Sequence, residues 1–167
     1  MKKKIYLSGA LEIYGMKYYS DPKKWCNRVK EYFNTYSDNF ICISPIDYYS
    51  NKTNYDKKEK EIFNFVLRKI MESNIILVNL DNIKHSVETY DEIFYAYLHN
   101  KPIIGFFEHI STNEKGLKSF IHPWKYIQID RIETGYNALT NACDYIKNYY
   151  GEEGDYELKT SSIQLMN

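Results

Sequence analysis

Acidic side chains follow the most apolar run of the sequence. The run is Ile75 to Val78, and residues 86–92, which read SVETYDE, come soon after it. Ser86 is a suitable N-cap, so a helix is predicted to begin there, and its N-terminus would favour an anion or a polar substrate group. Glu92 lies about a turn and a half into this helix. A carboxylate held there can attack an anomeric carbon and form a glycosyl-enzyme ester.

The same spacing has a purely structural interpretation. Acidic residues near the start of a helix complement its dipole without doing chemistry. The spacing alone therefore does not distinguish a catalytic Glu92 from one that only complements the helix dipole. The sequence contains no GxGxxG, GxxxxGK[ST] or GxSxG motif. These absences argue against dinucleotide binding, a P-loop and the usual serine hydrolase triad.

Metal and disulfide chemistry have little support in the sequence. Cys26, Cys42 and Cys143 are far apart and form no CxxC pair, and the four histidines show no ligand spacing. We therefore expect neither a metal nor another cofactor, and free cysteines fit a reducing cytoplasm.

Composition excludes further classes of partner. The 167 residues include 22 Lys and Arg and 22 Asp and Glu, so the net charge is zero. A neutral chain has no overall electrostatic attraction to polymeric nucleic acid or to an anionic membrane. No stretch approaches the roughly 20 apolar residues of a membrane helix. The 18 tyrosines are an excess that fits either base composition or a surface for stacking on bases.

Strands and helices are predicted to alternate along the chain. Short apolar runs without polar alternation indicate buried strands, and apolar stripes at helical spacing separate them. Such strands form a parallel sheet covered by helices on both faces, with the ligand beyond the carboxyl ends of the strands. We predict one domain over residues 1–150 and a polar tail over 151–167. The predicted strands are 5–7, 41–43, 75–78, 103–107 and 126–129; the predicted helices are 22–36, 56–70, 87–99 and 138–149.

Residues 4–124, about three-quarters of the chain, resemble the nucleoside 2-deoxyribosyltransferase family, which includes nucleoside 5'-monophosphate N-glycosidases. The resemblance rests on short pieces that occur in the same order. They are KIYLSG (4–9), SPIDYY (44–49), LRKI (67–70), IILVNL (75–80), SVxTxxE (86–92) with YAY (95–97), KPII (101–104) and HPW (122–124).

The resemblance implies both a fold and an activity. The fold is a flavodoxin-like three-layer α/β sandwich with a five-stranded parallel sheet. The activity is cleavage of the N-glycosidic bond of a 2'-deoxynucleoside, with Glu92 as the nucleophile. The deoxyribosyl group passes to another base, or to water in the hydrolases, without a metal. Family members work as oligomers, in which a neighbouring subunit completes the pocket.

The resemblance also implies which residues contact a nucleoside or nucleotide. Tyr6 matches a site tyrosine, and Ser8 and Gly9 match the loop that lines the sugar end. Ser86 matches the position where hydrolase members place a serine near the 5'-phosphate and where transferases often have an acid. The remaining candidates for ligand contact follow predicted strands or begin the helix that carries the nucleophile: Asp47, Tyr48, Asn79 and Glu88.

Three positions depart from the family pattern. Glu88 replaces a glycine, and its charge would repel a 5'-phosphate. Val66 replaces an aspartate that contacts the base and assists proton transfer, a step that commonly contributes roughly 10²–10⁴-fold. Ser73-Asn74 replaces Ser-Asp, a milder change. A catalytically degenerate nucleotide-binding or regulatory domain is therefore the alternative to a transferase or a hydrolase.

Overall fold

The computed structural model describes residues 1–10, 22–49 and 58–151. Five parallel strands form one sheet in the order β2-β1-β3-β4-β5. This arrangement confirms the predicted α/β sandwich, because consecutive parallel strands need helical crossovers. The strands are β1 (Lys3–Ser8), β2 (Phe40–Ile43), β3 (Ile75–Asn79), β4 (Ile103–Phe107) and β5 (Arg131–Thr134).

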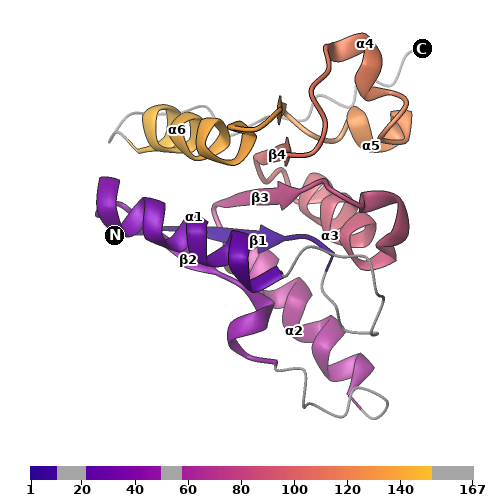
Figure 1. Ribbon diagram of the computed structural model, residues 1–167. Helices are drawn as coiled ribbons and strands as arrows, with labels where there is room; N and C mark the ends of the chain where they lie inside the picture. Colours follow the sequence, from indigo (N-terminus) through magenta and orange to yellow (C-terminus); the bar gives the residue numbers. More distant parts are fainter. Residues whose placement is uncertain (11–21, 50–57, 152–167) are drawn as a thin grey trace, which may run out of the picture.

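Helices cover both faces of this sheet. Helices α1 and α6 pack on one face, and α2 and α3 pack on the other (Figure 1). The predicted start of the second helix, at residues 56 and 57, and the polar tail from residue 152 lie outside the described residues. The helices are α1 (Pro22–Tyr36), α2 (Glu59–Glu72), α3 (Val87–Leu98), α4 (Glu114–Leu117), α5 (Pro123–Tyr126) and α6 (Ala138–Tyr150), with short 3-10 turns η2 (Pro45–Asp47) and η4 (Ile83–His85).

The fifth strand lies later in the chain than the sequence pattern indicates. The prediction placed it at residues 126–129, but Tyr126 ends helix α5 and the strand begins at Arg131. The helix forms because Pro123 occupies its first turn, where a missing N–H does no harm. His122 caps it, since Nδ1 accepts a hydrogen bond from the Trp124 N–H at 3.2 Å. Local capping therefore outweighs the apolar character of this segment.

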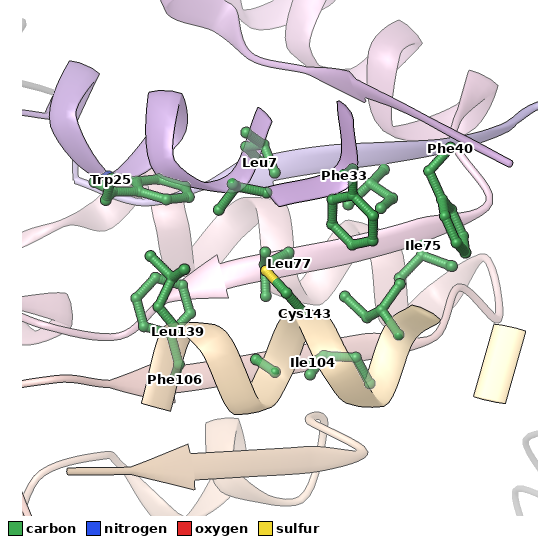
Figure 2. Packing of buried hydrophobic residues seen from close by; sticks show 14 of the residues in the cluster. Leu7, Trp25, Phe33, Phe40, Ile75, Leu77, Ile104, Phe106, Leu139 and Cys143 are labelled. Carbon is green, nitrogen blue, oxygen red and sulfur yellow. The ribbon is translucent and has the colours of Figure 1, made fainter. Parts of the chain in front are cut away.

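An apolar core fills the space between the sheet and helices α1 and α6 (Figure 2). Leu7 and Leu77 project into it from neighbouring strands, and the Trp25 ring meets the Phe106 ring edge-on at a centroid distance of 5.8 Å. Alternate strand residues point to opposite faces of a sheet. The intervening residues therefore face α2 and α3.

The second core, on the α2 and α3 face, contains a polar exception. Ile76, Val78 and Ile93 are apolar and fully buried, but Tyr6 is buried among them and carries a hydroxyl group. Ser8 lies two residues further along β1 and is also buried. Strand β1 thus directs hydroxyl groups toward helix α3. Within the described ranges, no helix is long and apolar enough to cross a bilayer.

Candidate active site

Glu92 and the two hydroxyl groups of β1 form a buried hydrogen-bonded group. The Tyr6 hydroxyl donates to Glu92 Oε1 at 2.6 Å, and the Ser8 hydroxyl donates to Oε2. Only 6% of Glu92 is exposed. Each carboxylate oxygen therefore accepts one hydrogen bond from β1, and a carboxylate has about two further lone-pair directions. Residues 84 and 86 positions apart in the sequence meet here, as the resemblance implies for Glu92, Tyr6 and Ser8.

Helix α3 positions the carboxylate. Ser86 caps the helix, because its hydroxyl oxygen accepts a hydrogen bond from the Thr89 N–H at 3.2 Å. The Ser86 and Thr89 hydroxyl groups also lie 2.7 Å apart, and both side chains are buried. Ser86 thus has the N-cap role predicted from the sequence. The cap fixes the first turn, so Glu92 in the next turn meets β1 at a defined height.

The environment of Glu92 raises the pKa of its carboxyl group. Burial raises the pKa of Glu92 from its ordinary value of 4.5 to about 7, while the hydrogen bonds from Ser8 and Tyr6 oppose that rise. The negative charges of Glu88 and Asp91 add to the rise. Burial, and after it the charge of Glu92, raise the pKa of Tyr6 well above its ordinary value. Tyr6 is therefore a hydrogen-bond donor at any physiological pH.

A close approach of β1 and β3 shapes the sheet edge beside this group. A Cβ atom on Gly9 would lie 3.1 Å from the Asn79 Cβ and 3.1 Å from Trp25 Cζ2, tighter than ordinary contacts. Glycine is therefore the residue that fits without displacement. Asn79 is buried, and its Oδ1 accepts the Asp81 N–H at 3.0 Å. The predicted positions Gly9 and Asn79 thus adjoin the site by packing.

Asp47 and Tyr48 have partners of their own. Asp47 Oδ1 lies 2.5 Å from Lys30 Nζ of helix α1. The Tyr48 ring packs on the Phe65 ring of helix α2 at a centroid distance of 4.7 Å and remains 56% exposed. In the described structure these contacts direct both side chains to residues outside the Glu92 group. Their predicted contact with ligand stays a prediction.

Val66 stands where the resemblance implies an aspartate that contacts the base. Both its side chain and its surroundings are apolar. Val66 lies on α2, is partly buried and packs against the core that contains Ile76 and Ile93. Among the described residues, no three His, Cys, Asp or Glu side chains gather in a way that could hold a metal ion.

Sequence reasoning missed Asp81 and His109. The buried Asp81 carboxylate accepts hydrogen bonds from the Glu108 and His109 N–H groups at 3.2 and 3.4 Å, and its Oδ2 lies 3.0 Å from His109 Nδ1. These contacts tie the loop after β3 to the loop after β4. Asp81 lies three residues after the end of the predicted strand 75–78, and this position near a strand end is the one signal that could have identified it.

Known proteins of similar structure share this fold. The sequence matches no protein-family model and no curated protein. A conserved protein from Enterococcus faecalis superposes with a TM-score of 0.64 at 14% identity, over 89% of this chain and 99% of that one. A 2-deoxyribosyltransferase from Bacillus psychrosaccharolyticus superposes with a TM-score of 0.50 at 14% identity, over 75% of this chain and 90% of that one.

At this level of identity the similarity establishes the fold. The chain has the flavodoxin-like α/β fold of a 2-deoxyribosyltransferase, as the resemblance implies. Function must be argued from the site, because one fold supports many activities.

Proposed function

We propose that the protein belongs to the nucleoside 2-deoxyribosyltransferase family and cleaves the N-glycosidic bond of a 2'-deoxynucleoside through Glu92. The observation that carries this proposal is the buried Glu92 carboxylate bonded to the Tyr6 and Ser8 hydroxyl groups. Its support also includes the sequence motifs around these residues and the fold shared with a 2-deoxyribosyltransferase. An ordinary structural carboxylate that complements a helix dipole does not need two buried hydroxyl donors from another strand.

The proposed reaction has two displacements at the anomeric carbon. In the first, a Glu92 oxygen bonds to C1', the bond from C1' to the base nitrogen breaks, and the base leaves with the electron pair and takes up a proton. In the second, a nitrogen of an acceptor base bonds to C1' and loses its proton, and the Glu92 carboxylate is released. Tyr6 and Ser8 orient the carboxylate through both steps.

The nucleophile must be ionised, which sets a direction for the pH dependence. Because the pKa of Glu92 is raised to about 7, the reactive carboxylate is the minor form below that pH in the free protein. The rate constant kcat/KM should therefore rise as pH increases through about 7 and level off above it.

A mechanism-based probe tests the proposal. A panel of 2-fluoro-2-deoxy nucleosides should leave a covalent sugar adduct on Glu92, detected by mass spectrometry of the intact protein and its peptides. Glu92→Gln should form no adduct, and Asp91→Asn, which alters the neighbouring residue, should still form one. The absence of both an adduct and base release across the panel would exclude the proposal.

The same panel separates a transferase from a hydrolase. We propose the transferase, so base release should require or be accelerated by a free acceptor base, with a new nucleoside as the product. Base release at the same rate without an acceptor, with free deoxyribose as the product, would instead identify water as the acceptor.

The surroundings of Val66 favour a second candidate, a catalytically degenerate domain that binds nucleotides. Val66 has no carboxyl group that could protonate the leaving base, and it packs against an apolar core. This candidate predicts ligand binding without turnover, and binding that Glu92→Gln leaves intact. Base exchange that Glu92→Gln abolishes would eliminate it.

We also propose that the protein is a homo-oligomer. Helix α3 carries Val87, Phe94 and Leu98 on its outer side at spacings of seven and four residues, and 73%, 46% and 54% of these side chains are exposed. Such an apolar stripe is typical of a helix that packs on a partner. Light scattering after size-exclusion chromatography should give a multiple of 20.0 kDa for the wild type and a lower mass for Phe94→Glu. A monomeric wild type would contradict the proposal.

A further inference from the structure

Helix α5 packs against helix α3 (Figure 1). The Lys125 ammonium group on α5 donates hydrogen bonds to the Tyr90 carbonyl oxygen at 2.9 Å and to Gln128 Oε1 at 3.2 Å. It also lies over the Tyr90 and Phe94 rings, 5.5 and 5.2 Å from their centroids. Lys125 therefore joins α5 to the turn of α3 that includes Glu92.

The contacts of Lys125 and the Glu92 carboxylate lie on opposite sides of this turn. Tyr90 and Phe94 are four residues apart and share one side of the helix, whereas Glu92, two residues from each, points about 200° away. Burial agrees with this geometry, because Glu92 is buried, Tyr90 is partly buried and 46% of Phe94 is exposed. The turn is therefore held from both sides, by the hydroxyl groups of β1 and by Lys125.

The HPW motif (122–124) places Lys125 at this turn. Pro123 begins α5, and the His122 side chain caps it. The same segment contacts α3 directly, since burial raises the pKa of Tyr90 and a hydrogen bond with the His122 backbone opposes that rise. The motif thus fixes both the start of α5 and its contact with α3, and Lys125 follows it directly in the sequence.

Charges of both signs surround the turn. Glu88 and Asp91 are exposed on α3, and Glu88 Oε2 accepts a hydrogen bond from the Ser86 hydroxyl group at 3.4 Å. Burial is the main cause of the raised pKa of Glu92, and the charges of Glu88 and Asp91 add to the rise. Burial lowers the pKa of Lys125, and the charge of Asp91 opposes that change. A cation held beside Asp91 offsets part of the negative charge that acts on Glu92.

The other elements around the carboxylate present neutral groups to it. Tyr6 and Ser8 of β1 donate hydrogen bonds to it. Strand β3 contributes Ile76 and Val78, and helix α2 contributes Ile70, to the apolar core on this face of the sheet. The charges that the described structure places at this turn therefore come from α3 and α5.

We infer that Lys125 is a positioning residue for Glu92, because it holds the α3 turn from the side opposite β1. The inference deepens the proposed function and rests on it, since Glu92 is the proposed nucleophile. Lys125 acts through the backbone of Tyr90 and through its charge beside Asp91. Loss of the ammonium group should therefore displace the carboxylate and favour its protonated form.

Steady-state kinetics across the pH range around 7 test this role. Lys125→Met keeps the length of the side chain but removes the ammonium group. It should lower kcat/KM for base exchange about tenfold at pH 7, because a small misplacement of a reacting group is costly. The midpoint of the rise in kcat/KM should move upward by roughly 0.5 pH unit, since a positive charge is lost. Lys125→Arg keeps the charge and the donors, so it should retain the midpoint and most of the activity.

Lys101→Met is the matched control. Lys101 is also partly buried, its pKa is also lowered by burial, and it donates to the carbonyl oxygens of Met71 and Ser73 at 2.9 and 2.7 Å. The variant loses the same kind of contact at the end of α2. It should therefore lower the melting temperature without moving the midpoint of kcat/KM.

A carbon-13 NMR titration of the Glu92 carboxyl group gives its midpoint in the free protein without turnover. The midpoint should be higher in Lys125→Met than in the wild type and unchanged in Lys125→Arg and Lys101→Met. An unchanged midpoint or unchanged kcat/KM in Lys125→Met, or equal changes in Lys101→Met, would overturn the role of Lys125 and leave the proposed function standing. If the wild type releases no base, the proposed function fails, and the titration alone decides whether Lys125 acts on Glu92.

Discussion

The two faces of β1 meet very different surroundings. On the face toward α1 and α6, Leu7 packs into an apolar core that includes the Trp25 and Phe106 rings (Figure 2). On the face toward α3, Tyr6 and Ser8 surround a buried carboxylate. The first face gains stability from burying apolar surface. The second face holds Glu92, whose charged form is disfavoured by burial. The buried carboxylate therefore lowers the stability of the folded protein.

One face of β1 therefore stabilises the fold, and the other face positions the candidate nucleophile. A rigid apolar core fixes β1 from one side, so the hydroxyl groups on the other side have fixed positions. Substitutions on the two faces should therefore have opposite profiles. Changes in the core should reduce stability, and changes at the site should reduce activity while leaving or increasing stability.

The largest expected effect is the loss of activity in Glu92→Gln. Removing the nucleophile should lower kcat/KM for base exchange roughly 10³- to 10⁶-fold, because no covalent intermediate can form. Steady-state kinetics above pH 7 measure this change, and circular dichroism checks that the fold is retained. A decrease of less than tenfold would mean that Glu92 is not the nucleophile.

The next effect is on the opposite face of the sheet. Phe106→Ala should lower the free energy of unfolding by about 3–5 kcal/mol, since the ring is fully buried and its loss leaves a cavity. Urea denaturation measures it. Tyr136→Ala is the control and should change stability by less than about 0.5 kcal/mol, because 91% of Tyr136 is exposed. A small effect of Phe106→Ala would contradict the role given to the apolar core.

Glu92→Gln should also stabilise the protein, by about 3 kcal/mol at most. The pKa of Glu92 is about 7 in the folded state, whereas the unfolded state has the ordinary value of 4.5. Between these values the unfolded state releases a proton that the folded state retains, so wild-type stability falls as pH rises. The gain in the variant should therefore be absent below pH 4, develop between about pH 4.5 and 7, and be complete above pH 7.

Denaturation of both proteins across this pH range measures the gain. Glu59→Gln should show no comparable pH-dependent gain, because Glu59 is exposed in the first turn of α2. A Glu92→Gln variant with the same stability difference at pH 4 and pH 8 would show that the carboxylate is not destabilised by burial.

The smallest expected effect concerns the start of α3. Ser86→Ala removes the acceptor of the Thr89 N–H and should lower the free energy of unfolding by about 1 kcal/mol. Ser86→Asn keeps a capping side chain and should retain most of that stability. Thermal unfolding of the three proteins ranks them. Equal stability of Ser86→Ala and the wild type would show that the cap does not hold the helix.

Sequence reasoning predicted the parts of this molecule that depend on local patterns. The apolar run of β3 and the Ser86 cap identified a strand and a helix, and alternation along the chain identified the parallel sheet. It failed at β5, where the His122 cap and Pro123 extend helical structure into the segment predicted as a strand. Short edge strands carry a weak pattern, and local capping then decides the structure.

The sequence predicted the site residues that belong to the family motifs. It did not predict contacts between segments that are far apart in the chain. Tyr6, Ser8 and Glu92 were identified together through the resemblance, and the structure brings them into hydrogen-bond contact. The ion pair of Asp47 with Lys30 depends on the distance between the turn η2 and helix α1, and no sequence spacing records that distance. The contacts of Asp81 escaped notice for the same reason.

Gly105 of strand β4 packs against the residue that begins the connection to helix α3. A Cβ atom at Gly105 would lie 2.5 Å from Leu80 Cδ1, so the Leu80 side chain occupies the space that another residue would fill. Leu80 begins the connection that leads through η4 to helix α3, and its N–H is bonded to the Phe106 carbonyl oxygen at 2.9 Å. Any larger residue at 105 would have to displace the Leu80 side chain. A substitution at this position of β4 therefore disturbs first the core that Leu80 shares with Ile93, the residue next to Glu92 on helix α3.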